Sequence, residues 1–155
     1  MVPRRTIRLV LWTNEENGVM GGKTYAKDHA DELPMHAAAI ESDSGGFDPV
    51  AMGTRIKGED KQARGNALLK GILPLFSPLN TTHIKPGASG VDISPMFDSG
   101  VPLLGLMSKP DIYFDYHHTA ADTIDKVNEE ELSRSVAAMA LLAYILAEMP
   151  GRLGD

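Results

Sequence analysis

The stretch that decides the fold is TIRLVLWTNEENG, residues 6–18, in which a nearly continuous apolar run passes directly into a polar turn. β-Branched, continuous apolar runs of this length are typical of strands buried on both faces of a parallel sheet. We therefore predict a buried strand over residues 6–12. A strand of this kind at the very start of a chain, without a leading hairpin, is unusual.

Strand and helix patterns alternate along the rest of the chain. Asn128 can cap the last helix, with Glu131 three residues on completing a capping box, and Pro150 ends that helix. The alternation predicts an α/β domain over residues 1–155, a three-layer αβα sandwich with a mostly parallel, mixed sheet. Further helices are expected near 22–32, 60–76 and 91–97, and strands at 36–41, 82–85 and 101–107. A loop is expected around Pro49 and Gly53. The last helix should bury a stripe made of Leu132, Val136, Met139, Ala143 and Leu146.

Composition excludes several classes of function. The chain has 155 residues and no cysteine, which removes disulfide scaffolds, thiolate zinc sites, iron–sulfur clusters and a cysteine nucleophile. A net charge of −6 with 6% aromatic residues argues against nucleic acid as a partner. The longest apolar stretch, residues 136–147, is too short to span a bilayer, so no membrane partner is expected. Carboxylate and metal chemistry remain open.

Acidic and histidine residues follow the ends of the predicted strands. Glu15 and Glu16 come after the first strand, Asp43 after the second, and His117 and His118 lie in a later loop. The carboxyl ends of strands form the ligand crevice of open α/β sheets, so these side chains could converge there. Carboxylates with imidazole suit zinc, manganese or non-haem iron. Taken singly, each has a simpler interpretation, as a solvated turn, an Asx-turn or a loop histidine.

The adjacent pair Glu15 and Glu16 has a specific chemical use. Neighbouring side chains on an irregular turn point in different directions, so one can bind a metal while the other faces a metal-bound water. A metal lowers the pKa of that water, and a carboxylate within hydrogen-bond reach can take its proton. The pair is therefore compatible with metal-assisted hydrolysis.

Four motifs in this order resemble the co-catalytic di-zinc aminopeptidase and glutamate carboxypeptidase family, and most of all its carboxypeptidase Q-like branch. They are residues 9–18 (LVLWTNEENG), 41–45 (ESDSG), 90–96 (GVDISPM) and 117–123 (HHTAADT). The resemblance runs from about residue 5 to residue 148. It implies a zinc-peptidase fold and a zinc-dependent exopeptidase that hydrolyses a peptide or dipeptide.

The resemblance also implies roles for individual residues. Glu15 matches the general base, and Glu16 and His118 match two ligands of one zinc. Asp43 matches a ligand of the other zinc. His117 falls where relatives often have tyrosine, which suggests an oxyanion-stabilising role.

Three further residues are weaker candidates. Asp122 either organises its loop or orients a ligating histidine. The loop around Ser89 resembles one that lines the substrate cleft, and Asp92 in that loop is either a cleft residue or a helix cap.

The family pattern is only partly present. In relatives a zinc-binding histidine and a metal-bridging aspartate precede the glutamate pair, and the fourteen residues before Glu15 contain neither type. We therefore expect a C-terminal portion of a catalytic domain without its N-terminal strands, with partial or no zinc occupancy and doubtful activity of its own. Relatives are commonly exported, which suggests a secreted or periplasmic location, although the chain has no signal peptide pattern.

An unpaired apolar strand over residues 6–12 invites association with another chain. We therefore expect homo-oligomers that form through this side of the domain. The alternative function is a non-catalytic fragment that keeps the fold and acts through self-association.

Overall fold

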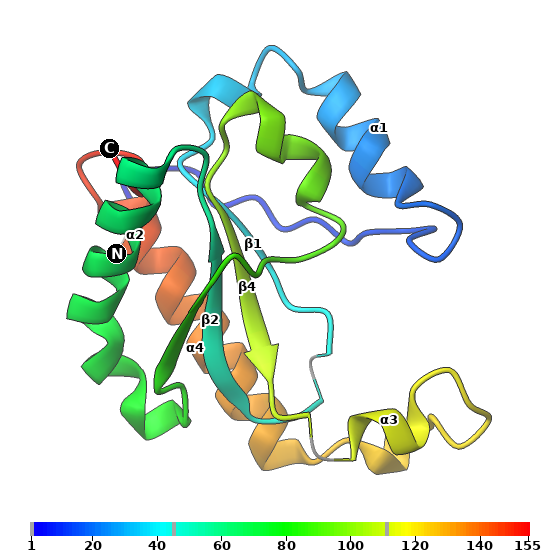
Figure 1. Cartoon of the computed structure of the whole chain (residues 1–155). Helices are drawn as coiled ribbons and strands as arrows, with labels where there is room; N and C mark the ends of the chain where they lie inside the picture. The colour runs from blue at the N-terminus through cyan, green and yellow to red at the C-terminus, as the bar shows by residue number, and fades with distance from the viewer. Residues whose placement is uncertain (1, 45, 111) are drawn as a thin grey trace.

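The computed structural model describes residues 2–44, 46–110 and 112–155, which form three layers with a sheet in the middle (Figure 1). Gly45 and Asp111, at the edges of two expected loops, lie outside the described residues. The strands are β1 (Ala39–Glu41), β2 (Pro49–Arg55), β3 (His83–Pro86) and β4 (Leu103–Ser108). The α-helices are α1 (Met20–Asp28), α2 (Glu59–Ile72), α3 (Tyr113–Tyr116) and α4 (Glu129–Glu148), and the 3₁₀ helices are η1 (Leu33–Met35), η2 (Leu73–Leu79), η3 (Ser94–Ser99) and η4 (Ile124–Lys126).

The sheet is mixed, as expected, with the strand order β1-β4-β2-β3. β1 pairs with β4 and β2 pairs with β3 in parallel, whereas β2 and β4 are antiparallel. The register places Glu41 of β1 opposite Gly105 of β4, and Gly105 opposite Gly53 of β2. These three residues form a row across the sheet.

Each face of the sheet has its own apolar core. One core joins the sheet to α2, η2 and α4, which Figure 1 shows together on one side. The other joins it to α1, η1 and η3 on the opposite side. Burial of apolar surface on both faces is the main force that holds such layers together. The buried residues are Met52, Ile56, Leu69, Phe76, Leu104, Leu106, Ala138, Leu142, Leu146 and Leu153 in the first core, and Leu33, Ile93, Met96, Val101 and Leu103 in the second.

The prediction of a buried strand over residues 6–12 is wrong. This segment has no strand assignment, and Leu9 and Leu11 are 86% and 83% exposed. No backbone–backbone hydrogen bond joins residues 6–12 to the rest of the described chain. A strand exists only when a neighbour completes its ladder, and the sheet ends at β1, whose three residues pair with β4.

The loop expected around Pro49 and Gly53 is instead the strand β2, which lies between β3 and β4. Pro49 is the first residue of β2, a position where proline is tolerated in sheets. Gly53 interrupts the apolar pattern because a segment of backbone lies against it: a Cβ there would lie 2.7 Å from the carbonyl oxygen of Ala88. Both residues thus have a place inside a strand.

The last helix was predicted with the correct cap, but only part of its predicted apolar stripe is buried. The side chain of Asn128 accepts hydrogen bonds from the N–H groups of Glu130 and Glu131 at 3.0 and 3.1 Å. Of the expected stripe, Leu146 is buried and Met139 packs against the core, but Val136 is 60% exposed. Leu132 is also exposed and Ala143 is half-buried. The residues that α4 buries are Ser135, Ala138, Leu142, Leu146 and Ala147.

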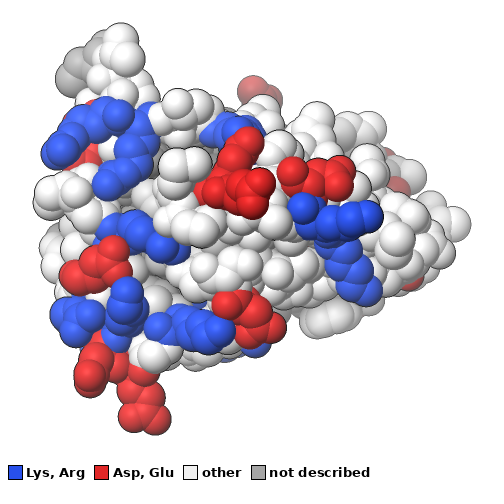
Figure 2. All heavy atoms as spheres, turned by 90° about the horizontal axis from the view of Figure 1, so that it is seen from above, with Lys and Arg blue, Asp and Glu red and all other residues white. Residues whose placement is uncertain are grey.

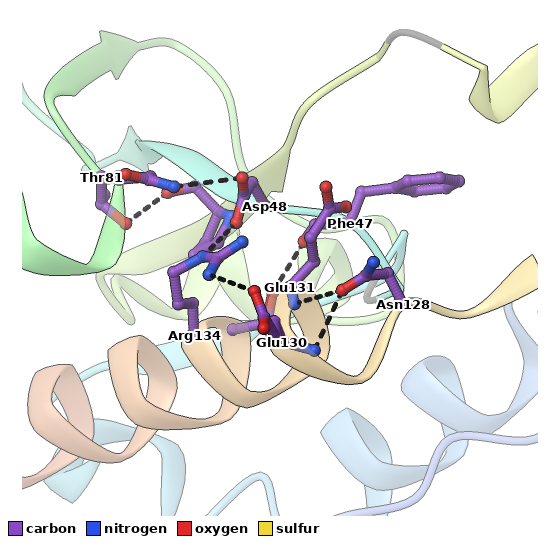
Figure 3. Close-up of polar contacts among 10 residues, drawn as sticks. Phe47, Asp48, Thr81, Asn128, Glu130, Glu131 and Arg134 are labelled. Atoms are coloured by element: carbon purple, nitrogen blue, oxygen red, sulfur yellow. Dashed lines mark hydrogen bonds and ion pairs between the residues drawn. The ribbon is translucent and has the colours of Figure 1, made fainter.

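Polar contacts attach the start of α4 to the start of β2 (Figure 3). Arg134 Nε donates to Asp48 Oδ1 at 2.5 Å, and Ser135 Oγ donates to the carbonyl of Phe47 at 2.8 Å. The Arg134 guanidinium holds the pKa of Asp48 below its usual value, with a smaller contribution from the amide of Asn80. These contacts fix where the chain enters β2.

The surface carries both signs of charge. Figure 2 shows Lys and Arg interspersed with Asp and Glu on the face seen from above in Figure 1. Among residues 2–44, 46–110 and 112–155, no helix combines the length and the apolar character that crossing a membrane requires.

Candidate active site

The glutamate pair lies on a tight turn that ends at α1. Asn14 and Val19 have positive φ angles of 62° and 59°. The carbonyl of Glu15 accepts the N–H groups of Gly18 and Val19 at 3.0 and 2.7 Å, so the turn is hydrogen-bonded internally. A left-handed valine is a genuine outlier, because its branched Cβ is crowded there. Such strain persists only where surrounding contacts fix the backbone, and it is often found at functional sites.

Glu16 and His118, which the family resemblance pairs as ligands of one zinc, lie side by side in the folded chain. His118 Nε2 lies 2.7 Å from Glu16 Oε1. The two side chains are 59% and 66% exposed, so they face solvent. His118 also has a left-handed backbone, with φ 57°. The loop after α3 therefore brings an imidazole to the carboxylate of the turn before α1.

Glu15 lies beside this pair in an acidic environment. Loss of hydration raises the pKa of its carboxyl, and repulsion from Glu16, Asp92 and Asp43 raises it further, while His118 acts in the opposite direction. A carboxylate with a raised pKa holds a proton more readily. The electrostatics thus favour Glu15 as the proton acceptor of this cluster.

An aromatic stack supports the histidine side of the site. The ring of His117 stacks on His118 at 3.8 Å and on Tyr113 at 4.8 Å between centroids. Phe47 meets Tyr113 edge-on at 6.2 Å. Tyr113 was not among the predicted site residues, although it lies four residues before His117, a spacing that places two side chains on one side of a helical turn.

Tyr113 belongs to the electrostatic neighbourhood of the site. Burial raises the pKa of its phenol, and the carboxylates of Asp43, Asp122 and Glu16 raise it further. Asp122 is exposed, and its described hydrogen bond is a backbone one, from its N–H to the carbonyl of Thr119 at 3.2 Å. Its role in orienting a ligating histidine stays a prediction.

Asp43 is near Glu15 but, in the described part of the chain, does not belong to a group of side chains arranged to hold a metal ion. It is exposed, two residues after the end of β1, and its charge raises the pKa of both Glu15 and Asp92. Among the described residues, no group of three or more His, Asp or Glu side chains is arranged to hold a metal ion. The role of Asp43 as a metal ligand therefore stays a prediction, and no such group of three in the described chain includes it.

The two predicted cleft residues lie on one loop over the sheet. Ser89 is half-buried, and its backbone lies against Gly105. Asp92 is only 6% exposed, and its Oδ1 has no hydrogen-bond partner among the described atoms. The alternative role of Asp92 as a helix cap is not seen, because η3 has no side-chain cap. Burial raises the pKa of Asp92, and so does the charge of Asp43.

The structure adds one buried carboxylate that sequence reasoning left without a role. Glu41 is 6% exposed, and its two oxygens accept the N–H groups of Val91 and Ile93, each at 3.0 Å. Burial raises the pKa of Glu41, and the two hydrogen bonds counteract part of that rise. A charged residue that ends an apolar strand could have pointed to such a contact, because buried carboxylates need partners.

Known proteins resemble this chain in sequence and in fold. The sequence model of peptidase family M28 matches residues 1–143. Carboxypeptidase Q from Rattus norvegicus is 35% identical over 147 residues, and carboxypeptidase Q from Homo sapiens is 33% identical over 147 residues. The crystal structure of a peptidase M28 precursor from Shewanella amazonensis SB2B is 38% identical and superposes with a TM-score of 0.88 over 99% of this chain, which confirms the predicted fold class.

These relatives are much longer than the chain. The matches cover 95% of this chain but 30% of the length of each carboxypeptidase Q, and 34% of the Shewanella protein. The chain thus spans about a third of the proteins it resembles.

Proposed function

Because the chain belongs to peptidase family M28, we propose that it contributes to a zinc-dependent exopeptidase site of the aminopeptidase, dipeptidase or glutamate carboxypeptidase type, acting on a peptide or dipeptide. The observation that carries the proposal is the convergence of Glu16 and His118, 2.7 Å apart, beside Glu15. Exopeptidase chemistry needs a proton acceptor next to a polarising centre, and this corner of the domain supplies both kinds of residue.

The donor set fits zinc in part. Carboxylate and imidazole are ordinary zinc ligands, so Glu16 and His118 would hold one ion. Zinc, when bound, polarises a carbonyl and lowers the pKa of a water molecule. Asp43 would be the protein ligand of a second ion, with partial or no occupancy, because no group of three ligands exists among the described residues.

The residues of the chain itself would act on protons and on orientation. Glu15 would take the proton from the attacking water on a carboxylate oxygen and pass it to the leaving amine. Loss of hydration, and then the neighbouring carboxylates, raise the pKa of Glu15, which favours transfer of a proton to it. The stack of Tyr113 and His117 would keep the His118 ring in place, since their centroids lie 4.8 Å apart and His117 lies 3.8 Å from His118.

Zinc titration by calorimetry tests the ligand assignment. We expect the wild-type chain to bind zinc, and Glu16→Ala or His118→Ala to weaken that binding at least tenfold, the factor that a loss of about 1.4 kcal/mol produces. His83→Ala, which removes an exposed histidine on β3, should leave the affinity within a factor of two. Equal affinities in all four proteins would refute the assignment.

Hydrolysis of a neutral dipeptide tests the proton acceptor. If the zinc-supplemented chain hydrolyses the dipeptide, Glu15→Gln should reduce kcat by at least a hundredfold, the typical contribution of general base catalysis, without a comparable change in zinc affinity. Hydrolysis that survives this substitution would eliminate Glu15 as the base.

The exposure of residues 6–12 favours a second candidate, a self-associating domain without catalysis. Ile7, Leu9 and Leu11 alternate along the segment and are 51%, 86% and 83% exposed. An open groove of about 420 Å³ lies beside the segment, between it and α1. Free backbone groups next to exposed apolar side chains are the features of an edge that recruits another strand.

The occupant that fits this edge is a second copy of the chain, paired antiparallel. Pairing about Leu9 would place Ile7 of each copy opposite Leu11 of the other. It would also bring Arg4 of one copy towards the acidic residues 15–16 of the other, while the Arg5 guanidinium donates to carbonyls at the end of α4 in its own chain. The segment is thus complementary to itself in charge as well as in apolar pattern.

Sedimentation velocity over a range of concentrations tests this candidate. We expect a dimer for the wild-type chain and a monomer for Leu9→Lys. The matched control is Leu75→Lys, which replaces a leucine that is 58% exposed on η2 and should leave the dimer intact. A wild-type monomer at every concentration would refute the candidate.

A further inference from the structure

The loop of residues 88–93 lies directly on the sheet, over the row formed by Glu41, Gly105 and Gly53. A Cβ on Gly53 would lie 2.7 Å from the carbonyl oxygen of Ala88, and one on Gly105 would lie 3.2 Å from the carbonyl carbon of Ser89. Figure 1 shows the chain after β3 crossing β2 and β4 on its way to η3. The two glycines therefore leave the space that the loop occupies.

Glu41 holds the loop at the β1 end of this row. Its carboxylate accepts the N–H groups of Val91 and Ile93, and a Cβ on Gly90 would lie 2.0 Å from Glu41 Cδ. Both carboxylate oxygens are therefore engaged, and the loop backbone is in contact with the carboxyl group. Hydrogen bonds to a buried charged acceptor are stronger than neutral ones.

The other side of the loop supports the helix that follows the glutamate turn. A Cβ on Gly22 of α1 would lie 2.0 Å from the carbonyl oxygen of Asp92, so α1 rests on the loop without a side chain between them. Gly21 is also close to Thr13: a Cβ there would lie 2.6 Å from the Thr13 carbonyl oxygen. A continuous set of backbone contacts thus links the loop to the turn that carries Glu15.

We propose that Glu41 is a positioning residue of the site, which clamps residues 88–93 and through them sets the placement of Asp43 relative to the Glu15 and Glu16 turn. On one side, Asp43 follows Glu41 by two residues, so anchoring Glu41 fixes where the chain leaves β1. On the other side, the clamped loop is the surface on which α1 sits. The relevance of this placement to zinc rests on the proposed function; the clamp itself does not.

NMR of the metal-free chain tests the clamp. In Glu41→Gln the side chain keeps one acceptor oxygen but points an NH₂ group at the second backbone N–H group. The rate of hydrogen exchange at the backbone N–H of Val91 or Ile93 should therefore rise at least tenfold. The amide resonances of Glu15, Glu16 and Asp43 should shift in the same variant. Thr81→Val is the matched control, because Thr81 is another buried polar residue bonded to the backbone: its hydroxyl donates to the carbonyl of Pro49, away from β1. It should leave these resonances in place.

A second variant approaches the loop from the helix side. Gly22→Ala places a methyl group where the Asp92 carbonyl lies, so it should shift the amide resonances of Val91, Ile93 and Asp43 on the opposite side of the loop. This variant keeps the test decisive if Glu41→Gln fails to fold.

The outcomes separate positioning from simple structural support. Two results for Glu41→Gln would overturn the proposal. One is faster hydrogen exchange at Val91 or Ile93 with unchanged amide resonances of Glu15, Glu16 and Asp43. The other is unchanged hydrogen exchange at both Val91 and Ile93. In a parallel zinc titration, Glu41→Gln should lose at least fivefold in affinity and Thr81→Val less than twofold. Absence of zinc binding by the wild-type chain would refute the proposed function, while the NMR result would still decide the clamp.

Discussion

His118 Nε2 lies 2.7 Å from Glu16 Oε1, although 102 residues separate the two in the sequence. Both side chains are more than half exposed, so the pair is held in place by the two loops that carry them and not by burial. A pair of this kind contributes little to folding and is free to serve binding.

Removing this pair should therefore leave the fold intact. We expect His118→Ala to change the melting temperature by less than about 2 °C, because exposed ion pairs are worth little. Circular dichroism during heating measures this directly. A fall of more than about 5 °C would show that the pair is structural, and loss of zinc binding in this variant would then no longer identify a ligand.

The observed face of α4 gives a prediction about stability. Leu142→Ala should lower the free energy of unfolding by about 2–5 kcal/mol, because Leu142 is fully buried between α4 and the sheet. Val136→Ala should change it by less than about 0.5 kcal/mol, because Val136 is 60% exposed. Urea denaturation followed by fluorescence measures both. A larger loss for Val136→Ala would instead support the stripe expected from the sequence.

The contact between Asp48 and Arg134 makes stability depend on pH. The pKa of Asp48 is lowered in the folded chain, so the unfolded chain binds its proton more tightly. Its contribution is therefore present above the unfolded pKa, about 3.9, and is lost as the pH falls through the lowered folded value. We expect the stability difference between wild type and Asp48→Asn to shrink from pH 6 to pH 3.

Urea denaturation at several pH values measures this difference. Asp98→Asn is the control, since the Asp98 side chain is 95% exposed and its difference from wild type should stay constant over the same range. If the stability difference between wild type and Asp48→Asn grew as the pH fell, it would contradict the predicted direction of the pH dependence.

Two glycines should respond oppositely to alanine. Gly53→Ala should destabilise the chain by at least about 1 kcal/mol, because its methyl group overpacks the contact with Ala88. Gly71→Ala should stabilise it by about 0.5–1 kcal/mol, because Gly71 lies in α2 with no atom within 4 Å of the added Cβ. Thermal denaturation of both variants checks the pair. A stable Gly53→Ala would show that the loop does not rest on the sheet there.

Local patterns were enough to predict the elements that depend on neighbours in the sequence. The Asn128 cap of α4 is an example, because its acceptor and the two N–H groups it satisfies lie within three residues. The chemical types of the residues at Glu15, Glu16 and His118 were also readable. Their convergence was expected from strand ends that share one edge of a sheet, but no strand of the described chain precedes Glu15, and His118 follows the helix α3.

The predictions that failed depend on partners distant in the sequence. The composition of residues 6–12 favours a strand, but a strand also needs a ladder partner, and in the described chain the sheet ends at β1. Gly53 suggested a loop, whereas its lack of a side chain serves a loop 35 residues away that lies on β2.

The sequence by itself therefore determined the class of fold, the alternation of its elements and the chemical types of residue at the site. Periodicity and short-range capping are properties of the local chain, so they can be read directly. Only the tertiary structure decided which face of α4 is buried, that residues 49–55 form a strand of the sheet, and that Glu41 accepts two N–H groups from a loop 50 residues away. These features depend on packing and hydrogen bonding between segments that are distant in the sequence, so no local pattern predicts them.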